Sequence, residues 1–456
     1  MIAAVLNKND ICDITIDDLG EFGEGIGRVD GFAVFVPGAL PGEQVSAKIV
    51  KVKKNYGYGK LIDILAPSAD RVAPVCSVFE RCGGCSLQHL SYTAQLAHKQ
   101  RKITAQLKHI GGFEADVPPV LGMTDPFGYR NKGQFPVAAK NGQTVCGFYQ
   151  RRSHDVVPIT RCAIQHPSAT HALRLTRQFL VENDIKPYDE MNHSGFVRHV
   201  LIRTGFTTGE ILVCLVINGH TLPHTEKLIR TLAPLKGLAS ICLNINTRKG
   251  NVILGETTKI IWGKSAITDF IGPLQFQISA ASFFQVNPVQ TKVLYELCVE
   301  MAALEPSDVV FDAYCGIGTI ALFMARHARN VYGVEIVPQA IADAKQNAAL
   351  NHLYNTEFFI GDAADILPSW LDKQRVMPNM VVLDPPRAGC DVRLLHALCR
   401  TKPDKILYVS CNPATLARDL KELCAGSVYH VEAVRGVDCF PMTTHVETIV
   451  LLQRQV

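Results

Sequence analysis

The last third of the chain alternates short apolar segments with helix-like segments, and this alternation constrains the fold more than any other feature. From about residue 290, strand candidates lie at 309–311, 330–334, 380–383 and 405–409, with helical patterns at 341–351 and 392–400. Alternating strands and helices form βαβ units, in which the strands are parallel and the helices cover the sheet. The sequence therefore predicts an α/β domain with a mainly parallel, doubly wound sheet over residues 281–456.

The two segments that precede this domain have a different texture. Residues 1–66 contain short apolar runs at 14–16, 32–36, 45–50 and 59–64, separated by glycine and proline. Short strands with frequent turns predict a small β-barrel. Residues 67–280 are mainly strand-like, apart from an amphipathic helix expected over 92–110, which could pack on the C-terminal domain.

Composition places the chain among globular proteins and limits the kind of surface that it can offer to a partner. Of its 456 residues, 47% are hydrophobic and 19% are charged, and the net charge is +4. So small an excess of positive charge requires any phosphate-binding surface to be a local patch. One candidate runs from Lys48 to Lys60, where five lysines and two tyrosines occur without an acid. It is either a solvated edge strand or an RNA-contacting edge.

No apolar stretch approaches the roughly 18 residues that a membrane helix needs, and the first apolar run is too short for a signal peptide. We therefore expect a cytoplasmic protein with no membrane partner. Fifteen cysteines in such a protein favour thiol chemistry or a metal site over disulfides.

Three of these cysteines have the spacing of metal ligands. Cys76, Cys82 and Cys85 are separated by five and two residues, and glycines stand between the last two. Zinc and an iron–sulfur cluster both suit this spacing, and a set of merely buried thiols is the alternative. A fourth ligand must come from elsewhere in the chain, and Cys162 is the best candidate.

A glycine-rich turn over residues 312–319 joins a predicted strand to a predicted helix. Glycines there let the backbone approach a ligand closely, but no third glycine completes a dinucleotide fingerprint. Glu335 ends the next strand, where a carboxylate can hold ribose hydroxyls, and Asp362 could face an adenine amino group from the strand after it. A glycine turn followed by an acidic strand end favours S-adenosylmethionine over NAD.

Cys411 stands between the strand at 406–409 and a helix that begins near residue 415. Sites in open α/β sheets collect at such strand ends, and a helix N-terminus favours a thiolate. Asp384-Pro-Pro-Arg387 follows another strand, and Glu447 lies in His445-Val-Glu447. A nucleic-acid amino-methyltransferase would use a similar Pro-Pro loop with an aromatic residue in place of Arg387. That reading leaves Cys411 and Glu447 without a role, and a non-enzymatic RNA-binding protein or iron–sulfur sensor would have no use for the cofactor motifs.

Taken together, these residues resemble the RNA 5-methyluridine methyltransferases over the whole length of the chain. The resemblance rests on the N-terminal barrel, which is similar to a TRAM domain, and on a series of short motifs. These motifs are Cys82-Gly-Gly-Cys85, Gly128-Tyr-Arg-Asn-Lys132, Phe283-Phe-Gln-Val-Asn287, the turn at 312–318, Asp384-Pro-Pro-Arg387, Ser410-Cys-Asn-Pro413 and His445-Val-Glu447.

The resemblance implies a Rossmann-like class I methyltransferase domain, a TRAM or OB-like barrel and a central, mainly β iron–sulfur domain. It implies that Cys411 is the nucleophile and Glu447 the base, and that the enzyme acts on 23S ribosomal RNA, since the four-cysteine set is typical of that branch and not of the transfer RNA branch. We expect a monomer. The implied ligands of a [4Fe–4S] cluster are Cys76, Cys82, Cys85 and Cys162, and the implied contacts of S-adenosylmethionine are Gln285, Tyr314, Glu335 and Asp384.

Overall fold

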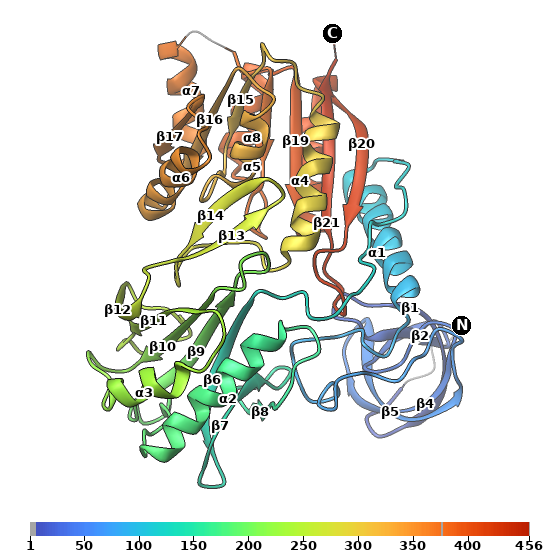
Figure 1. Ribbon diagram of the computed structural model, residues 1–456. Coiled ribbons are helices and arrows are strands. Elements are labelled where there is room, and N and C mark those ends of the chain that lie inside the picture. Colours follow the sequence, from blue (N-terminus) through green and yellow to red (C-terminus); the bar gives the residue numbers. More distant parts are fainter. Residues whose placement is uncertain (1–5, 375–376, 456) are drawn as a thin grey trace.

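A seven-stranded sheet forms the C-terminal part of the protein in the computed structural model, which describes residues 6–374 and 377–455 (Figure 1). The strand order is β17-β16-β15-β18-β19-β21-β20. The first five strands are parallel, whereas β21 and β20 are antiparallel additions, so the predicted mainly parallel sheet is confirmed. The bounds are β15 (Val309–Asp312), β16 (Asn330–Glu335), β17 (Thr356–Ile360), β18 (Met380–Leu383), β19 (Lys405–Ser410), β20 (Tyr429–Val437) and β21 (Glu447–Arg454).

Helices cover both faces of this sheet because neighbouring residues of each strand point to opposite sides. Val310 and Leu407 face one hydrophobic cluster, and Phe311 and Ile406 face the other. The first cluster contains α4 (Pro288–Ala302), α5 (Thr319–Ala325) and α6 (Pro338–Leu350). The second contains α7 (Ala363–Gln374), α8 (Val392–Thr401) and α9 (Pro413–Leu423).

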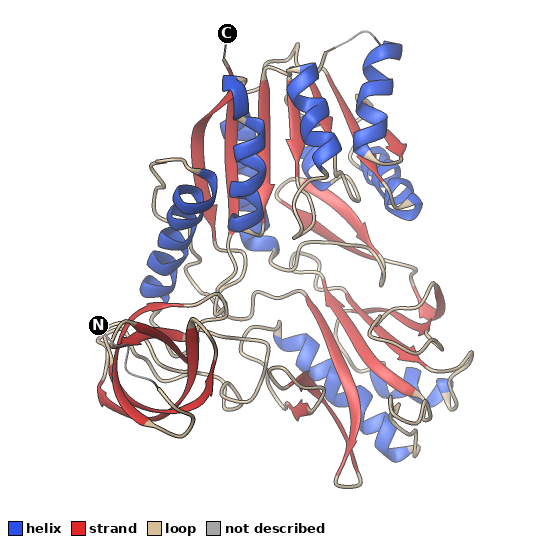
Figure 2. Ribbon diagram, turned by 180° about the vertical axis from the view of Figure 1, so that it is seen from behind, coloured by secondary structure: helices blue, strands red, loops and turns tan. Residues whose placement is uncertain are grey.

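The helix expected over 92–110 is present as α1 (Tyr92–Gln106), which continues into the π-helical turn η1 (Leu107–Gly111). Ile103 and Leu107 are fully buried in the second cluster of the C-terminal domain. From behind, α1 stands directly above the barrel and beside the sheet (Figure 2). The buried ion pair of Lys99, in the middle of α1, with Asp438, at 2.6 Å, fixes the helix to the residues that follow β20.

The N-terminal segment forms a closed barrel in the order β1-β2-β3-β5-β4, as the sequence predicts. Its core is small and consists of alternating residues such as Ile14, Ile16 and Val34. The sequence did not indicate strand β2, because its glycines interrupt the alternation of apolar residues. Gly27 is required there, since a Cβ at this position would clash with the Thr15 carbonyl oxygen. The bounds are β1 (Ile11–Leu19), β2 (Gly25–Val29), β3 (Phe32–Val36), β4 (Gln44–Val52) and β5 (Tyr56–Ala66).

The central segment contains a second seven-stranded sheet, in the order β12-β11-β10-β9-β6-β7-β8. Two helices that the sequence did not indicate, α2 (Pro167–Glu182) and α3 (Thr225–Leu232), cover one face. The other face shares a core with the β13–β14 hairpin and α4, which explains why β9 and β10 are buried throughout. The strands are β6 (Lys132–Lys140), β7 (Gln143–Tyr149), β8 (Val156–Pro158), β9 (Val197–Thr204), β10 (Ile211–Ile217), β11 (Leu238–Ile245), β12 (Thr257–Gly263), β13 (Ile267–Ile271) and β14 (Leu274–Ile278).

Contacts with the barrel tie the three segments together. Lys102 of α1 forms an ion pair with Glu21 at 3.2 Å, and the Thr444 hydroxyl donates to the Glu21 carbonyl at 2.8 Å. Arg152, from the central segment, reaches Glu24 at 3.2 Å. Of the helices in the described ranges, none has both the length and the apolar character that crossing a bilayer requires.

Candidate active site

Three predicted site residues meet at one edge of the C-terminal sheet. Asp384 directly follows β18, Cys411 directly follows β19, and Glu447 begins β21. The strand register aligns them, because Leu383 pairs with Tyr408 and Ser410 pairs with Thr448. Glu447 is buried, whereas Asp384 and Cys411 are half-buried, so the thiol is accessible beside two carboxyl groups.

The loop that carries Asp384 is fastened to the start of α9, which follows Cys411. Asn412 caps α9 by accepting a hydrogen bond from the Ala414 amide at 3.1 Å. Its side-chain nitrogen donates to the Arg387 carbonyl at 3.2 Å, and the Thr415 hydroxyl donates to the same carbonyl at 3.3 Å. The two loops that form the site therefore hold each other.

Asp419, which is buried on α9, connects strand β19 to the loop that follows β18. One carboxylate oxygen accepts from the Tyr408 hydroxyl at 2.7 Å and from the Cys390 amide at 2.8 Å. The other is paired with Arg418, which also donates to the Ala388 carbonyl at 2.9 Å. Strand β19 and the loop after β18 are thus tied through one buried carboxylate.

Burial sets the proton affinities at this edge. It raises the pKa of Glu447 to about 8, with a further contribution from Asp384, while Arg387 opposes the shift. Burial likewise raises the pKa of Asp384 to about 7. Once it has lost its own proton, Glu447 therefore accepts a proton near neutral pH more readily than an ordinary glutamate does.

The thiol of Cys411 differs from the expectation drawn from its place before a helix. Burial, and next the carboxylate of Glu447, raise its pKa to about 11, although Arg387 lowers it. Desolvation and two nearby carboxyls therefore outweigh the helix N-terminus, and the resting thiol is protonated at neutral pH.

The carboxyl ends of β15 and β16 present the groups expected around a cofactor. Gly316 and Gly318 have positive φ angles of 54° and 87°, as the tight turn after β15 requires. Glu335 is half-buried, and its side chain accepts from the Val337 amide at 3.0 Å. Gln285 lies in a loop that Asn131 of the central segment holds by donating to its carbonyl at 2.9 Å.

Tyr314 and Asp362 flank this region. Tyr314 is half-buried, and burial followed by the neighbouring Cys390 raises its pKa far above the usual value. Asp362 caps α7 by accepting from the Ala364 amide at 2.9 Å, and it forms an ion pair with Arg393 at 2.8 Å. The Asp362 carboxylate is therefore already occupied on one side.

Three residues at this edge were not predicted as site residues, although each lies in a motif that the sequence analysis singled out. Asp312 is buried, burial raises its pKa to about 7, and one carboxyl oxygen has no hydrogen-bond partner. Arg387 is the guanidinium that lowers the pKa of both Cys411 and Glu447. His445 lies edge-on to Phe440, and burial lowers its pKa to about 4, so it is uncharged at neutral pH.

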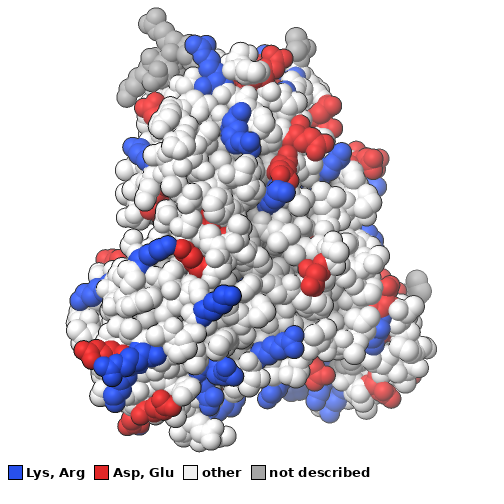
Figure 3. Space-filling model, in the orientation of Figure 1, with Lys and Arg blue, Asp and Glu red and all other residues white. Residues whose placement is uncertain are grey.

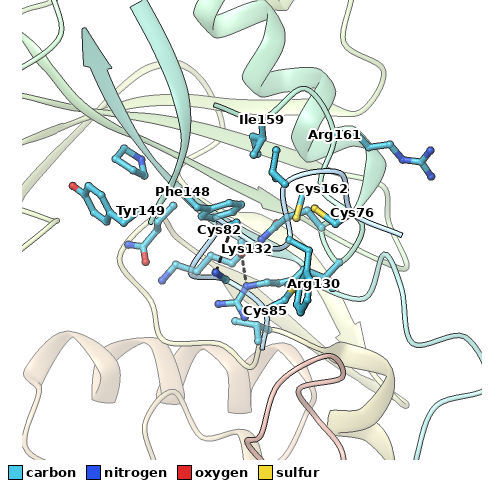
Figure 4. Close-up of a pocket in the computed structure, with 18 of the residues that line it drawn as sticks. Cys76, Cys82, Cys85, Arg130, Lys132, Phe148, Tyr149, Ile159, Arg161 and Cys162 are labelled. Atoms are coloured by element: carbon cyan, nitrogen blue, oxygen red, sulfur yellow. Dashed lines mark hydrogen bonds between the residues drawn. The ribbon is translucent and has the colours of Figure 1, made fainter. Parts of the chain in front are cut away.

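The four predicted metal ligands lie together around one cavity. Cys76, Cys82, Cys85 and Cys162 line one cavity of about 460 Å³ in the central segment (Figure 4). Arg130 and Lys132 line the same cavity, whereas Arg161 points away from the thiols. In the part of the chain that the structure describes, no three His, Cys, Asp or Glu side chains are arranged so that they could hold a metal ion.

Comparison with known proteins identifies the relatives of this chain. Residues 91–455 match the family model described as tRNA (uracil-5-)-methyltransferase, and residues 7–62 match the TRAM domain. An uncharacterized RNA methyltransferase of Halalkalibacterium halodurans is 49% identical over 99% of this chain and 98% of its own length. One from Listeria monocytogenes is 47% identical over 99% of both chains.

A solved structure shares the whole architecture. The tRNA (uracil-54, C5)-methyltransferase of Pyrococcus abyssi, in complex with S-adenosyl-L-homocysteine, superimposes with a TM-score of 0.77 and 28% identity. The similarity covers 97% of this chain and 100% of the archaeal one. The fold, the family model and the relatives agree: the chain belongs to the tRNA (uracil-5-)-methyltransferase family, as an S-adenosylmethionine-dependent RNA methyltransferase with a TRAM domain at its start.

Proposed function

We propose that this enzyme transfers a methyl group to carbon 5 of a uridine in 23S ribosomal RNA through a covalent bond between Cys411 and carbon 6 of the base. The observation that carries the proposal is the register of β19 with β21, which brings Cys411 and Glu447 to the same sheet edge beside Asp384. An amino-methyltransferase would need neither the thiol nor Glu447.

The chemistry requires both residues because carbon 5 of uracil is a poor nucleophile. Cys411 gives up its proton to solvent and its sulfur bonds to carbon 6, which makes carbon 5 enolate-like. Arg387 assists this step, since it lowers the pKa of the thiol. After methylation, Glu447 in its ionised form takes the carbon 5 proton, the double bond re-forms, and the bond from sulfur to carbon 6 breaks.

Bound S-adenosylmethionine supplies the activated methyl group, and the residues at the ends of β15 and β16 suit it. The glycine turn lets the backbone approach, Glu335 can hold ribose hydroxyls, and Asp312 has a buried carboxyl oxygen without a partner. We assign Gln285, Tyr314, Asp362 and Asp384 to the same cofactor site. We assign to Phe283, which is 71% exposed, the role of stacking on a uracil that has left its helix.

We further propose that Cys76, Cys82, Cys85 and Cys162 hold a [4Fe–4S] cluster. Such a cluster spaces its four thiolates more widely than one zinc ion does, which suits thiols that share a cavity without forming a single-ion site. The lining residues contain Arg130 and Lys132 and no Asp or Glu, so the site favours an anionic group. The role that we assign to the cluster is structural.

We assign RNA binding to the barrel of residues 1–66, the cluster to residues 67–280 and methyl transfer to residues 281–456. The barrel has the surface for this role, because Lys48, Lys51, Lys53, Lys54 and Lys60 are all exposed. Arg152 of the central segment lies over the ring of Tyr58, 6.0 Å from its centre, so basic groups continue beyond the barrel. We also propose that the enzyme is cytoplasmic and acts as a monomer.

Transfer RNA is the second candidate substrate, because the similar Pyrococcus abyssi enzyme acts on uracil 54 of tRNA. The two are separated by measuring tritium release from 5-tritiated uridine in 23S ribosomal RNA and in tRNA. We expect release from the ribosomal transcript, and a protein–RNA adduct on denaturing gels when Glu447 is replaced by Gln. Methylation without tritium release would overturn carbon 5 chemistry, and release from tRNA alone would overturn the ribosomal target.

A further inference from the structure

A second hollow lies on the outer side of the segment that carries Cys162. It has a volume of about 480 Å³ and is walled by the loop at 125–128, the segment at 160–165 and the first turns of α2. We call it the α2 groove. Arg161, His171 and Arg174 line it, together with the hydroxyl-bearing Thr160 and Thr170. One acid, Asp125, also lines it, and its carboxylate accepts from the Phe127 amide at 3.1 Å.

The basic side chains of the α2 groove are exposed and carry no internal partner. Across residues 6–374 and 377–455, no hydrogen bond or ion pair engages the side chains of Arg161, His171 or Arg174. Arg161 lines both the cysteine cavity and the α2 groove, and its side chain extends away from the thiols (Figure 4). His171 and Arg174 are one helical turn apart, so they face the same side of α2. The groove therefore gathers positive charge that the fold itself does not use.

Hydrogen bonds connect the wall of the groove to the loop that bears Gln285. The Arg130 amide donates to the Ile164 carbonyl at 2.9 Å, and the His166 amide donates to the Arg130 carbonyl at 3.1 Å. The next residue, Asn131, donates from its backbone and side chain to the carbonyls of Val286 and Gln285, each at 2.9 Å. One strand-like segment thus separates the groove from the loop assigned to cofactor and uracil.

From this arrangement we propose that the α2 groove binds the phosphodiester backbone of the substrate RNA on one side of the target uridine. The inference rests on the proposed function for the position of the uridine. Arginine forks and a histidine match phosphate oxygens, and the two threonine hydroxyls can donate to them. Lys and Arg side chains, with Asp and Glu side chains among them, are spread over the lower part of the molecule, where the central segment and the barrel lie (Figure 3).

The test uses a double variant that carries both Arg161→Ala and Arg174→Ala. It is compared with the parent protein and with the single variant Arg177→Ala. Arg177 lies on the same helix, but its side chain donates to the Thr144 carbonyl at 2.9 Å and it does not line the groove. Binding of a fluorescent RNA that contains the target uridine is measured by anisotropy from 0.05 to 0.5 M salt. Each lost contact to single-stranded RNA should reduce the slope of log affinity against log salt by about 0.7. Two lost contacts reduce it by about 1.4, which over the tenfold range from about 1 M to 0.1 M salt weakens binding roughly 25-fold at the lower concentration.

Because Arg161 adjoins Cys162, the single variant Arg174→Glu is measured beside the double variant, and the iron content of each protein is determined. We expect reduced affinity and slope in both groove variants, unchanged values for Arg177→Ala, and crosslinks from 4-thiouridine next to the target site to residues 160–174. Parent-like affinity and slope in both groove variants would overturn the proposal. Polyglutamate binding that is lost in those variants would then assign the groove to an acidic protein segment. Failure of the proposed function is distinct: the parent protein itself would bind the RNA and release no tritium.

Discussion

Replacing Glu447 with Gln should stabilise the protein at alkaline pH while it stalls turnover. In the folded state the pKa of Glu447 is raised from an ordinary 4.5 to about 8, chiefly by burial. The folded protein therefore holds this proton more tightly than the unfolded chain does. Between about pH 4.5 and 8 the unfolded state releases the proton first, so the free energy of unfolding falls as pH rises through this window.

The size of the effect follows from the shift in pKa. One pKa unit corresponds to about 1.4 kcal/mol, so the full shift of Glu447 corresponds to about 5 kcal/mol above pH 8. Gln carries no titrating proton and escapes this loss, whereas Asp384 contributes to parent and variant alike. We expect the two proteins to differ little at pH 5, and the variant to be more stable at pH 9 by up to about 5 kcal/mol, or roughly 5 °C in Tm for a chain of this length.

The assay is thermal and urea unfolding of both proteins at pH 5 and pH 9, with the tritium-release assay alongside. Asp404→Asn provides a matched control, since Asp404 is half-exposed, is paired with Arg454 at 2.7 Å and adjoins the opposite end of β19. Its effect on stability should not grow between pH 5 and pH 9. A stability difference between Glu447→Gln and the parent that is the same at both pH values would refute the argument from burial.

Four further outcomes test other parts of the site. Cys411→Ala should abolish tritium release and leave S-adenosylmethionine affinity, measured by calorimetry, within about twofold, because the thiol is needed only for addition; appreciable product would remove the covalent mechanism. The Cys82→Ser variant should lose iron, sulfide and the visible absorbance near roughly 400 nm, and its Tm should fall, because one open ligand position leaves the loops unanchored. Stoichiometric zinc without sulfide in the parent protein would contradict the cluster. Lys51, Lys53 and Lys54 replaced together by Ala should reduce the salt slope of RNA binding by about 0.7–0.9 per lost contact and leave the rate at saturating RNA nearly unchanged; parent-like binding at every salt concentration would confine recognition to the rest of the molecule. The Asp419→Asn variant should form the adduct on 5-fluorouridine RNA about tenfold more slowly, with little change in cofactor affinity. The reason is that an amide cannot keep all three contacts of the carboxylate, which are with Tyr408, Cys390 and Arg418. A proportional loss of cofactor affinity would indicate a general structural defect instead.

Local patterns in the sequence were sufficient for the barrel, the parallel sheet and the long helix at 92–110. Each of these elements has its signal in neighbouring residues: apolar runs of strand length, helical spacing, and glycine or proline at the ends. The signal fails where packing replaces it. Strand β2 is built around Gly25 and Gly27, which fit because neighbouring backbone lies too close for a side chain. The helix α2 was missed within a segment read as mainly strand.

The site residues divide in the same way. Cys411 and Asp384 are visible in the sequence because each follows a predicted strand in a short motif, and the carboxyl ends of parallel strands meet at one edge. Glu447 is visible only through the motif His445-Val-Glu447 and the family resemblance. Their proton affinities are not visible there. A helix N-terminus predicts an acidic thiol, but burial beside Glu447 raises the pKa of Cys411 to about 11.

Only the tertiary structure decides such values, because desolvation depends on every atom packed around a group and charge pairing depends on distances across loops far apart in the chain. The same reason applies to Asp419, which joins the loop after β18 to β19. It also applies to Cys162, which shares a cavity with Cys76, Cys82 and Cys85 although 76 residues separate it from the last of them. Sequence determines which groups are available and which element carries each. Their neighbours, and hence their chemistry, are set when the three segments pack.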